Sequence, residues 1–379
     1  MTQEKEFDFS LSDSQATAVE PLTPEKFDIP AYEAYEQELN ERCDAFWKGK
    51  EGVLVYRRMR VKEVFSTDCR DMRKSLEWQL GALRKSMEFK ADVPNFLEPW
   101  YGLGTVASAF GFGYVWNPGQ APAVDGHFGS VEEMLAYDAR PVRETEIGRH
   151  TLEMVEYFLE KTGGRLPVSY CDVQSPLNVV GNIVDSNQFY MDFVLNPDLV
   201  RWAFDRVADL FVEYMKIQRE MIGGALAKPG HGFSSSRTFE GMGMSDDNAV
   251  MLPGDMYSEL AVPAFVKACA PFGGGVFHSC GNWSDKKRLV AGIEGLRMAD
   301  GAFTKATDPA ANPTEGFAEA FAGSGVVLNA RMVGSPETVG QKVRELWRPG
   351  MKLIVVTYCE TLMHQALDKQ LAVCSQRKQ

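Results

Sequence analysis

Short apolar runs alternate with longer amphipathic segments along most of this chain. Apolar residues recur at helical spacing between positions 76 and 87, and again in a long stripe between 200 and 221. Such spacing predicts helices that each lay one face on a core. Short β-branched runs bounded by turn residues instead predict buried parallel strands. The clearest runs of this kind lie at 165–170, 273–277, 326–328 and 352–358.

The order of these elements predicts an α/β fold. Strand and helix alternate without internal repeats, and the open-ended alternation favours a closed (β/α)8 TIM barrel. We expect residues 1–95 to form a polar lead-in and a helical extension, with 31–90 helical, and residues 96–379 to form the barrel. Ser335-Pro336 is expected to begin a late helix, because serine caps helices and proline suits the first turn.

Composition and charge narrow the class of protein. The chain has 379 residues, with 40 Lys and Arg against 52 Asp and Glu, and a net charge of −12. This acidic balance argues against nucleic acid or an anionic membrane as a general partner. No apolar stretch approaches the roughly 18 residues needed to cross a bilayer, and the first residues lack the pattern of a secretion signal. The 7 scattered cysteines suit a reducing cytoplasm, which is the expected location.

The strongest chemical signal is a set of three soft metal ligands. His278 and Cys280 end one predicted strand, and Cys359 ends another. Strand ends of one barrel meet at a single face, so these side chains can converge. One imidazole and two thiolates suit a tetrahedral Zn²⁺ ion and leave a fourth position for exchange, as in catalytic sites. Asp300 is our candidate fourth ligand, and Glu360 is a weaker one because strand neighbours point to opposite faces.

The other polar candidates are weaker. Four residues in loops or strand ends predicted on the active face are candidates for substrate contact: Gln174, Asp246, Asp247 and Asn329. Trp100 and Tyr101 could line an apolar pocket, although loop packing explains them as well. Cys171 follows a strand, but core packing explains it better. The remaining histidines have no ligand-like spacing and are expected to be surface or packing residues: His127, His150, His231 and His364.

The metal-binding stretch also resembles a known family. His278-Ser279-Cys280-Gly281-Asn282, with a second cysteine far downstream, is similar to the His-x-Cys signature of zinc-dependent, corrinoid-linked methyltransferases in the uroporphyrinogen decarboxylase superfamily. Weaker likeness at 187–197 and 245–253 extends the resemblance to about residues 98–375. The resemblance implies a TIM barrel, bound zinc and methyl exchange with a separate corrinoid protein. No corrinoid-binding module is recognisable here, so the cobalt is expected on a partner.

The resemblance favours a methyltransferase that acts between the corrinoid (cobalamin) protein and a small thiol or methylated donor. Coenzyme M, a methyl ether, a methylated thiol and a methylamine all remain open as the small molecule. The decarboxylases of the superfamily carry an Arg-Gln-Ala-Gly-Arg signature that we do not find, since the nearest basic pair is Arg70 and Arg73. A metal-free decarboxylase or lyase is therefore the less favoured alternative. A non-catalytic zinc-binding subunit is the other.

Overall fold

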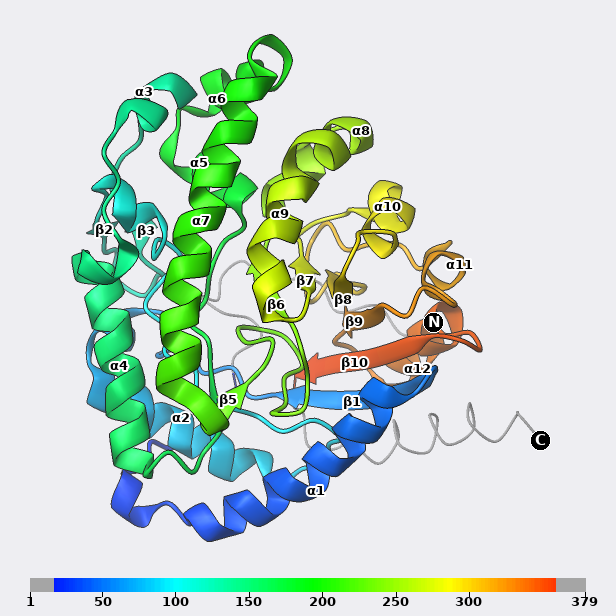
Figure 1. Cartoon of the computed structure of the whole chain (residues 1–379). Helices are drawn as coiled ribbons and strands as arrows, with labels where there is room; N and C mark the ends of the chain where they lie inside the picture. The colour runs from blue at the N-terminus through cyan, green and yellow to red at the C-terminus, as the bar shows by residue number, and fades with distance from the viewer. Residues whose placement is uncertain (1–16, 359–379) are drawn as a thin grey trace.

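A parallel sheet occupies the centre of the computed structural model, which describes residues 17–358. Six strands lie in the order β1-β10-β9-β8-β7-β6, and every neighbouring pair is parallel (Figure 1). The ten strands are β1 (Gly52–Arg58), β2 (Tyr114–Val115), β3 (Ala123–Val124), β4 (Val168–Ser169), β5 (Leu226–Ala227), β6 (Met242–Ser245), β7 (Gly275–His278), β8 (Leu296–Ala302), β9 (Val327–Arg331) and β10 (Lys352–Tyr358).

Isolated parallel bridges continue this sheet toward a ring. Tyr56 of β1 pairs with Val93, Leu97 pairs with the first residue of β4, and Gln174 pairs with the last residue of β6. Strand β4 also pairs in parallel with β5. These links connect the two edges of the six-stranded sheet through the segments 93–97 and 168–174. The predicted α/β TIM-barrel fold is confirmed.

Helices cover the outside of the sheet, as Figure 1 shows for α7 and α9 beside β6 and β7. The helices are α1 (Ile29–Lys48), α2 (Met72–Ser86), α3 (Val131–Ala136), α4 (Glu146–Thr162), α5 (Pro176–Ile183), α6 (Ser186–Leu195), α7 (Pro197–Ile222), α8 (Gly254–Met256), α9 (Val262–Cys269), α10 (Lys287–Ala291), α11 (Phe317–Phe321) and α12 (Pro336–Leu346). The two predicted stripes are α2 and α7, and Ser335 caps α12 as expected. Among residues 17–358, no helix has the length and apolar character needed to span a membrane.

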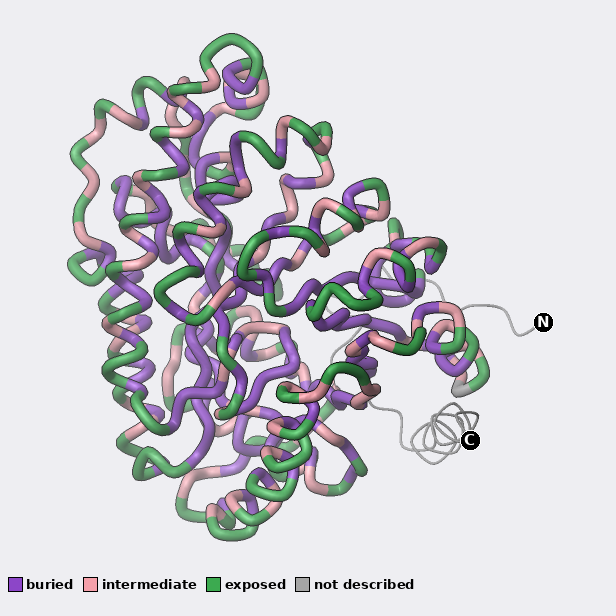
Figure 2. Tube along the Cα trace, turned by 45° about the vertical axis from the view of Figure 1, so that its right-hand side comes forward, coloured by how far each residue is buried: buried purple, intermediate pink, exposed green. Residues whose placement is uncertain are grey.

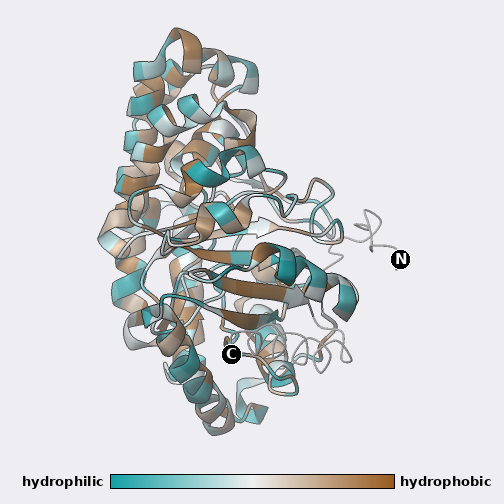
Figure 3. Cartoon of the chain, turned by 90° about the vertical axis from the view of Figure 1, so that its right-hand side faces the viewer, coloured by the Kyte–Doolittle hydropathy of each residue, from teal (hydrophilic) through white to brown (hydrophobic). Residues whose placement is uncertain are grey.

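Alternate residues of the strands form two separate apolar layers, because strand side chains point to opposite faces in turn. Phe277 of β7 and Val355 of β10 join the large cluster under the helices. Val276 and Ile354, their sequence neighbours, meet in a smaller cluster inside the barrel. Phe46 of α1 belongs to this inner cluster, so α1 closes the barrel from the N-terminal side. Figure 2 shows the buried strands at the centre, and Figure 3 shows that they are also the most hydrophobic ribbons.

The prediction of a purely helical extension over 31–90 is wrong. Between α1 and α2 the chain forms β1, which pairs with β10 from Gly52 opposite Lys352 to Arg58 opposite Tyr358. Strand β1 is therefore part of the central sheet, and a boundary at residue 95 does not separate an extension from the barrel. The physical reason is tertiary. Residues 52–58 are stabilised as a strand by pairing with β10, and this pairing outweighs the helical pattern of the segments on either side. The helix expected near Cys374 lies outside the described residues.

Gly301 of β8 is expected to be intolerant of a larger side chain. A Cβ atom there would lie 2.9 Å from Cζ2 and 3.0 Å from Nε1 of Trp283, which is fully buried. Gly301→Ala should therefore lower the free energy of unfolding by about 1–3 kcal/mol, the usual cost of overpacking. Thermal or denaturant unfolding measures the change. Gly224→Ala is the matched control, since no atom lies within 4 Å of its added Cβ; equal stability of the two variants would contradict the prediction.

Candidate metal centre

Three potential metal ligands converge at the C-terminal ends of β6 and β7. Asp247, His278 and Cys280 bring an oxygen, a nitrogen and a sulfur atom within 4.8 Å of one another. Nε2 of His278 lies 3.4 Å from Sγ of Cys280 and 3.6 Å from Oδ1 of Asp247. Zinc bonds of about 2.0–2.3 Å would place tetrahedral ligand atoms roughly 3.3–3.8 Å apart. Both separations fall in this range, so the donor set fits zinc in chemistry and in spacing.

The strand pattern explains why His278 faces the centre of the barrel. His278 lies two residues beyond Val276, whose side chain belongs to the inner cluster, so it continues the inward-facing row. The same register places Asp300 beside it, because β7 and β8 pair His278 with Asp300. On β9, Asn329 is in turn paired with Asp300. The inner row is thus apolar near the N-terminal strand ends and polar at the C-terminal ends, where TIM barrels hold their active sites.

Backbone hydrogen bonds fix the loop that carries Cys280. Its own N–H donates to Oδ1 of Asp247 at 2.7 Å, and the N–H of Gly281 donates to Oδ2 of Asp308 at 2.8 Å. Gly281 has a φ of +72°, a left-handed conformation that favours glycine. The N–H of Trp283 then donates to Oδ1 of Asn312 at 2.9 Å. The thiol is therefore held by a loop with defined geometry.

Asp300 lies behind the imidazole ring. Its Oδ2 accepts a hydrogen bond of 2.5 Å from Nδ1 of His278 and one of 2.9 Å from Nε of Arg331. An ionised carboxylate only accepts, so Nδ1 carries a proton, and Nε2 is the nitrogen that faces Cys280. This position is that of an orienting carboxylate, and it differs from the fourth-ligand position that we expected for Asp300. Asp247 is the carboxylate that faces Nε2.

The negative groups around His278 favour a positive charge at this ring. Burial alone lowers the pKa of His278, but Cys280 and Asp300 outweigh it and raise the pKa well above its usual value. For Asp300, burial raises the pKa, yet the positive charges of Arg331 and His278 hold it below the ordinary value. A carboxylate that stays ionised behind the ring makes Nε2 a stronger donor to a cation.

The cluster lines a cavity of about 440 Å³. A volume of this size accommodates a small organic substrate. Of the predicted substrate residues, Gln174 and Asp247 line the cavity. Asp246 instead accepts hydrogen bonds from Ser175 and from Tyr257, the latter at 2.6 Å. Asn329 donates to Asp300 at 2.5 Å, so it supports the orienting carboxylate.

Trp100 lines the wall of the cavity, as its sequence position allowed. Three further cavity residues were not predicted: Phe65, Arg58 and Arg60. Arg58 ends β1 and Arg60 lies two residues beyond it, so the basic residues at the site are these and not the pair Arg70 and Arg73. Recognising a strand at 52–58 would have indicated them, since residues just past a barrel strand reach the active face.

His231 also lines the cavity, in contrast to our expectation of a surface or packing residue. Its neighbours Glu98 and Asp172 lie just past the bridge residue Leu97 and past β4, a proximity that sequence spacing does not reveal.

The cysteines of the described residues differ in burial. Cys171 is buried, and burial raises the pKa of its thiol to about 12, in agreement with core packing. Among residues 17–358, Cys280 is the one cysteine that is exposed. Cys359, the predicted third ligand, lies outside the described residues, as does Glu360; the description of β10 ends at Tyr358. The ligand role of Cys359 therefore remains a prediction.

Comparison with known proteins supports the same fold. Residues 53–229 match the family model described as Uroporphyrinogen decarboxylase (URO-D). A similar solved structure is a methyltransferase from Methanosarcina mazei, with 16% identity, a TM-score of 0.55, and coverage of 90% of this chain and 98% of that chain. At this identity the likeness establishes a shared fold. No curated protein matches the sequence significantly. The family match begins at β1 and ends before Asp247, and the resemblance to the uroporphyrinogen decarboxylase superfamily read from the sequence is thereby confirmed over residues 53–229.

Proposed function

We propose that this chain is a zinc-dependent methyltransferase that moves a methyl group between a corrinoid on a partner protein and a small thiol or methylated donor. The observation that carries the proposal is the cluster of Asp247, His278 and Cys280, with ligand atoms within 4.8 Å of one another in a cavity of about 440 Å³. A nitrogen and sulfur donor set beside an open cavity is typical of catalytic zinc. The fold shared with a protein described as a methyltransferase is in keeping with it.

The described residues divide the work of such a site. Asp247, His278 and Cys280 would hold the ion, with Cys359 as the further predicted ligand. When bound, zinc supplies a Lewis-acid position at which a thiol loses its proton or a donor heteroatom is polarised. Asp300 holds the imidazole in the metal-binding tautomer. Phe65 and Trp100 offer apolar walls for a methylated donor.

The location of the cavity indicates where the partner would dock. Its residues follow the C-terminal ends of strands β1, β6, β7 and β8, so it belongs to the same face of the barrel. A corrinoid protein would have to cover this face to bring its cobalt near the substrate atom. This chain would then contribute binding, orientation and exclusion of water, while the corrinoid carries the methyl group.

The direct test is an assay of methyl transfer with zinc content measured in the same preparation. Methylcobalamin is offered with a panel of small thiols, and Co(I) cobalamin with methyl ethers, methyl thioethers and methylamines. We expect about one zinc per chain and transfer with at least one member of the panel. Transfer should disappear on chelation and return with added zinc. Metal-free protein that shows no transfer after zinc addition would refute the proposal.

A decarboxylase is the second candidate, because Arg58 and Arg60 line the cavity and guanidinium groups suit carboxylate substrates. This reading predicts loss of CO₂ from a porphyrinogen without added metal. It makes no use of the spacing between His278 and Cys280. The same purified protein, assayed with uroporphyrinogen in the presence of a chelator, separates the two functions.

A further inference from the structure

A second titratable cluster lies on the wall of the cavity that holds the candidate metal ligands. Nδ1 of His231 forms a hydrogen bond with Oε1 of Glu98, and Nε2 lies 3.4 Å from Oδ2 of Asp172. We propose that His231, oriented by Glu98, is the residue that takes the proton from the substrate heteroatom or returns it. This inference rests on the proposed function and names a catalytic group for it.

His231 is both accessible and held in place. About 20% of its side chain remains exposed, while the side chains of Glu98 and Asp172 are 7% and 2% exposed. The imidazole therefore lies at the surface of the cavity, with Glu98 beside Nδ1 and Asp172 beside Nε2. A ring contact with Phe65, with centroids 5.7 Å apart, covers another side.

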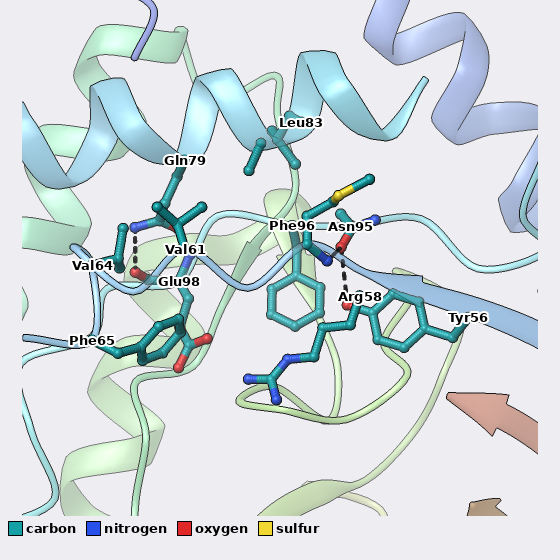
Figure 4. A pocket seen from close by; sticks show the side chains of 12 residues that line it. Tyr56, Arg58, Val61, Val64, Phe65, Gln79, Leu83, Asn95, Phe96 and Glu98 are labelled. Carbon is teal, nitrogen blue, oxygen red and sulfur yellow. Dashed lines mark hydrogen bonds between the residues drawn. The ribbon is translucent and has the colours of Figure 1, made fainter. Parts of the chain in front are cut away.

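The buried side chain of Gln79 fixes the backbone of Glu98, the residue that carries the orienting carboxylate. Nε2 of Gln79 donates to the carbonyl oxygen of Glu98 at 2.9 Å, and Oε1 of Gln79 accepts from the N–H of Glu98 at 2.5 Å. Figure 4 shows Gln79 reaching from α2 to the backbone of Glu98, whose carboxylate extends past the ring of Phe65. This pair of bonds fixes the position of the backbone from which the carboxylate of Glu98 reaches His231.

The tautomer of His231 follows from this contact. An ionised carboxylate accepts and does not donate, so the hydrogen bond requires a proton on Nδ1. Nε2 then carries the lone pair. Its separation of 3.4 Å from Asp172 is longer than an ordinary hydrogen bond, which leaves Nε2 available to a substrate. A base whose far nitrogen is oriented by a carboxylate is the arrangement that general-base catalysis uses.

The surrounding charges define the environment of this base. Burial raises the pKa of Asp172, although His231 opposes the shift, and Nε1 of Trp100 donates to the same carboxylate at 3.0 Å. Two cations line this part of the cavity, Arg58 and Arg60, and the guanidinium of Arg60 lies 4.2 Å from the centre of the Phe65 ring. The facing titratable groups are therefore Glu98, Asp172 and these arginines.

The proton transfer balances in both directions of methyl exchange. With a thiol acceptor, the S–H bond breaks, a new N–H bond forms on Nε2, and the sulfur keeps the electron pair with which it attacks the methyl carbon. The electron pair of the carbon–cobalt bond then remains with the partner's cobalt. With a methyl ether donor, Nε2–H gives its proton to the departing oxygen, which keeps the pair of the broken carbon–oxygen bond, while the methyl carbon forms its new bond with the electron pair of the partner's Co(I).

The test combines two variants with a pH profile. His231→Ala should keep its zinc and lose about 10²–10⁴-fold in kcat, the usual contribution of general acid–base catalysis. Added imidazole should restore part of the rate in His231→Ala and none in the wild type. His231→Gln should also be slow, and the step in the pH–rate profile that depends on this base should disappear. His127→Ala is the matched control, since His127 is exposed and lies outside the cavity.

The possible outcomes test the role of His231 separately from the methyltransferase assignment. If the wild type transfers methyl groups and both His231 variants do so equally fast, the inference is overturned while the methyltransferase assignment stands. If the wild type transfers none, the proposed function fails, and ¹⁵N NMR of the histidine ring decides the role of His231. The resonances missing in His231→Gln identify the residue. A change in Nε2 protonation on addition of 2-mercaptoethanol supports the inference, and an unchanged ring overturns it.

Discussion

Replacing Cys280 with alanine should remove most of the bound zinc and abolish methyl transfer. Cys280 supplies the sulfur of the candidate cluster, 3.4 Å from Nε2 of His278. Removing one of the few protein ligands of a catalytic metal leaves a carboxylate and an imidazole, which bind zinc far more weakly. Zinc content by elemental analysis and transfer from methylcobalamin measure the two effects. Stability should change little, because Cys280 is exposed and contributes little to the core.

Cys269→Ala is the matched control for this experiment. Cys269 is fully buried, and burial raises the pKa of its thiol. Its removal should reduce stability through lost packing by about 1–2 kcal/mol and leave zinc content unchanged. Full zinc content and full activity in Cys280→Ala would contradict the metal site itself, whatever the behaviour of the control.

Asp300→Ala should weaken both the fold and the metal site. Its carboxylate is buried and contacts His278, Asn329 and Arg331. Removing one partner from a buried charge pair typically costs about 3–5 kcal/mol. Loss of the carboxylate that orients a metal-binding histidine typically lowers metal affinity about 10–100-fold. Denaturant unfolding of the zinc-free protein and a competitive zinc titration measure the two effects separately.

Asp300→Asn separates charge from shape. Asparagine retains one acceptor for Nδ1 of His278 but has no charge to offer Arg331. We expect zinc affinity to fall less than in Asp300→Ala. A variant Asp300→Ala with the stability and the zinc affinity of the wild type would show that the carboxylate is dispensable, and the role of Asp300 as the orienting group would then be wrong.

The barrel and half of the candidate site could be predicted because strong local patterns encode them. The stripe of α7 repeats over several turns, and β7 and β10 are apolar runs bounded by glycine or charged residues. Parallel strands place their C-terminal ends together, so the sequence alone predicts that His278 and Cys280 lie on the active face. The strand at 52–58 was missed because a short apolar run between two helical segments does not reveal its partner.

The carboxylates could not be assigned from the sequence because their roles depend on register. Asp300 lies within β8 and Asp247 lies two residues beyond β6, yet one pairs with Nδ1 and the other faces Nε2. Pairing between β7 and β8 decides this, and pairing is a tertiary property. The role of His231 was not predicted for a related reason. Glu98 and Asp172 are distant from it in sequence, and the three residues come together only in the folded barrel.

The barrel interior is divided into an apolar layer and a polar layer, and this division determines which substitutions the protein can accept. Inward-facing residues near α1 supply stability without touching the chemistry, whereas those at the opposite end carry charge. Substrate preference can therefore be altered through an exposed loop residue such as Leu103, which lines the cavity and lies outside the inner apolar cluster. A barrel built on this plan can change what its cavity binds while its interior continues to hold the fold.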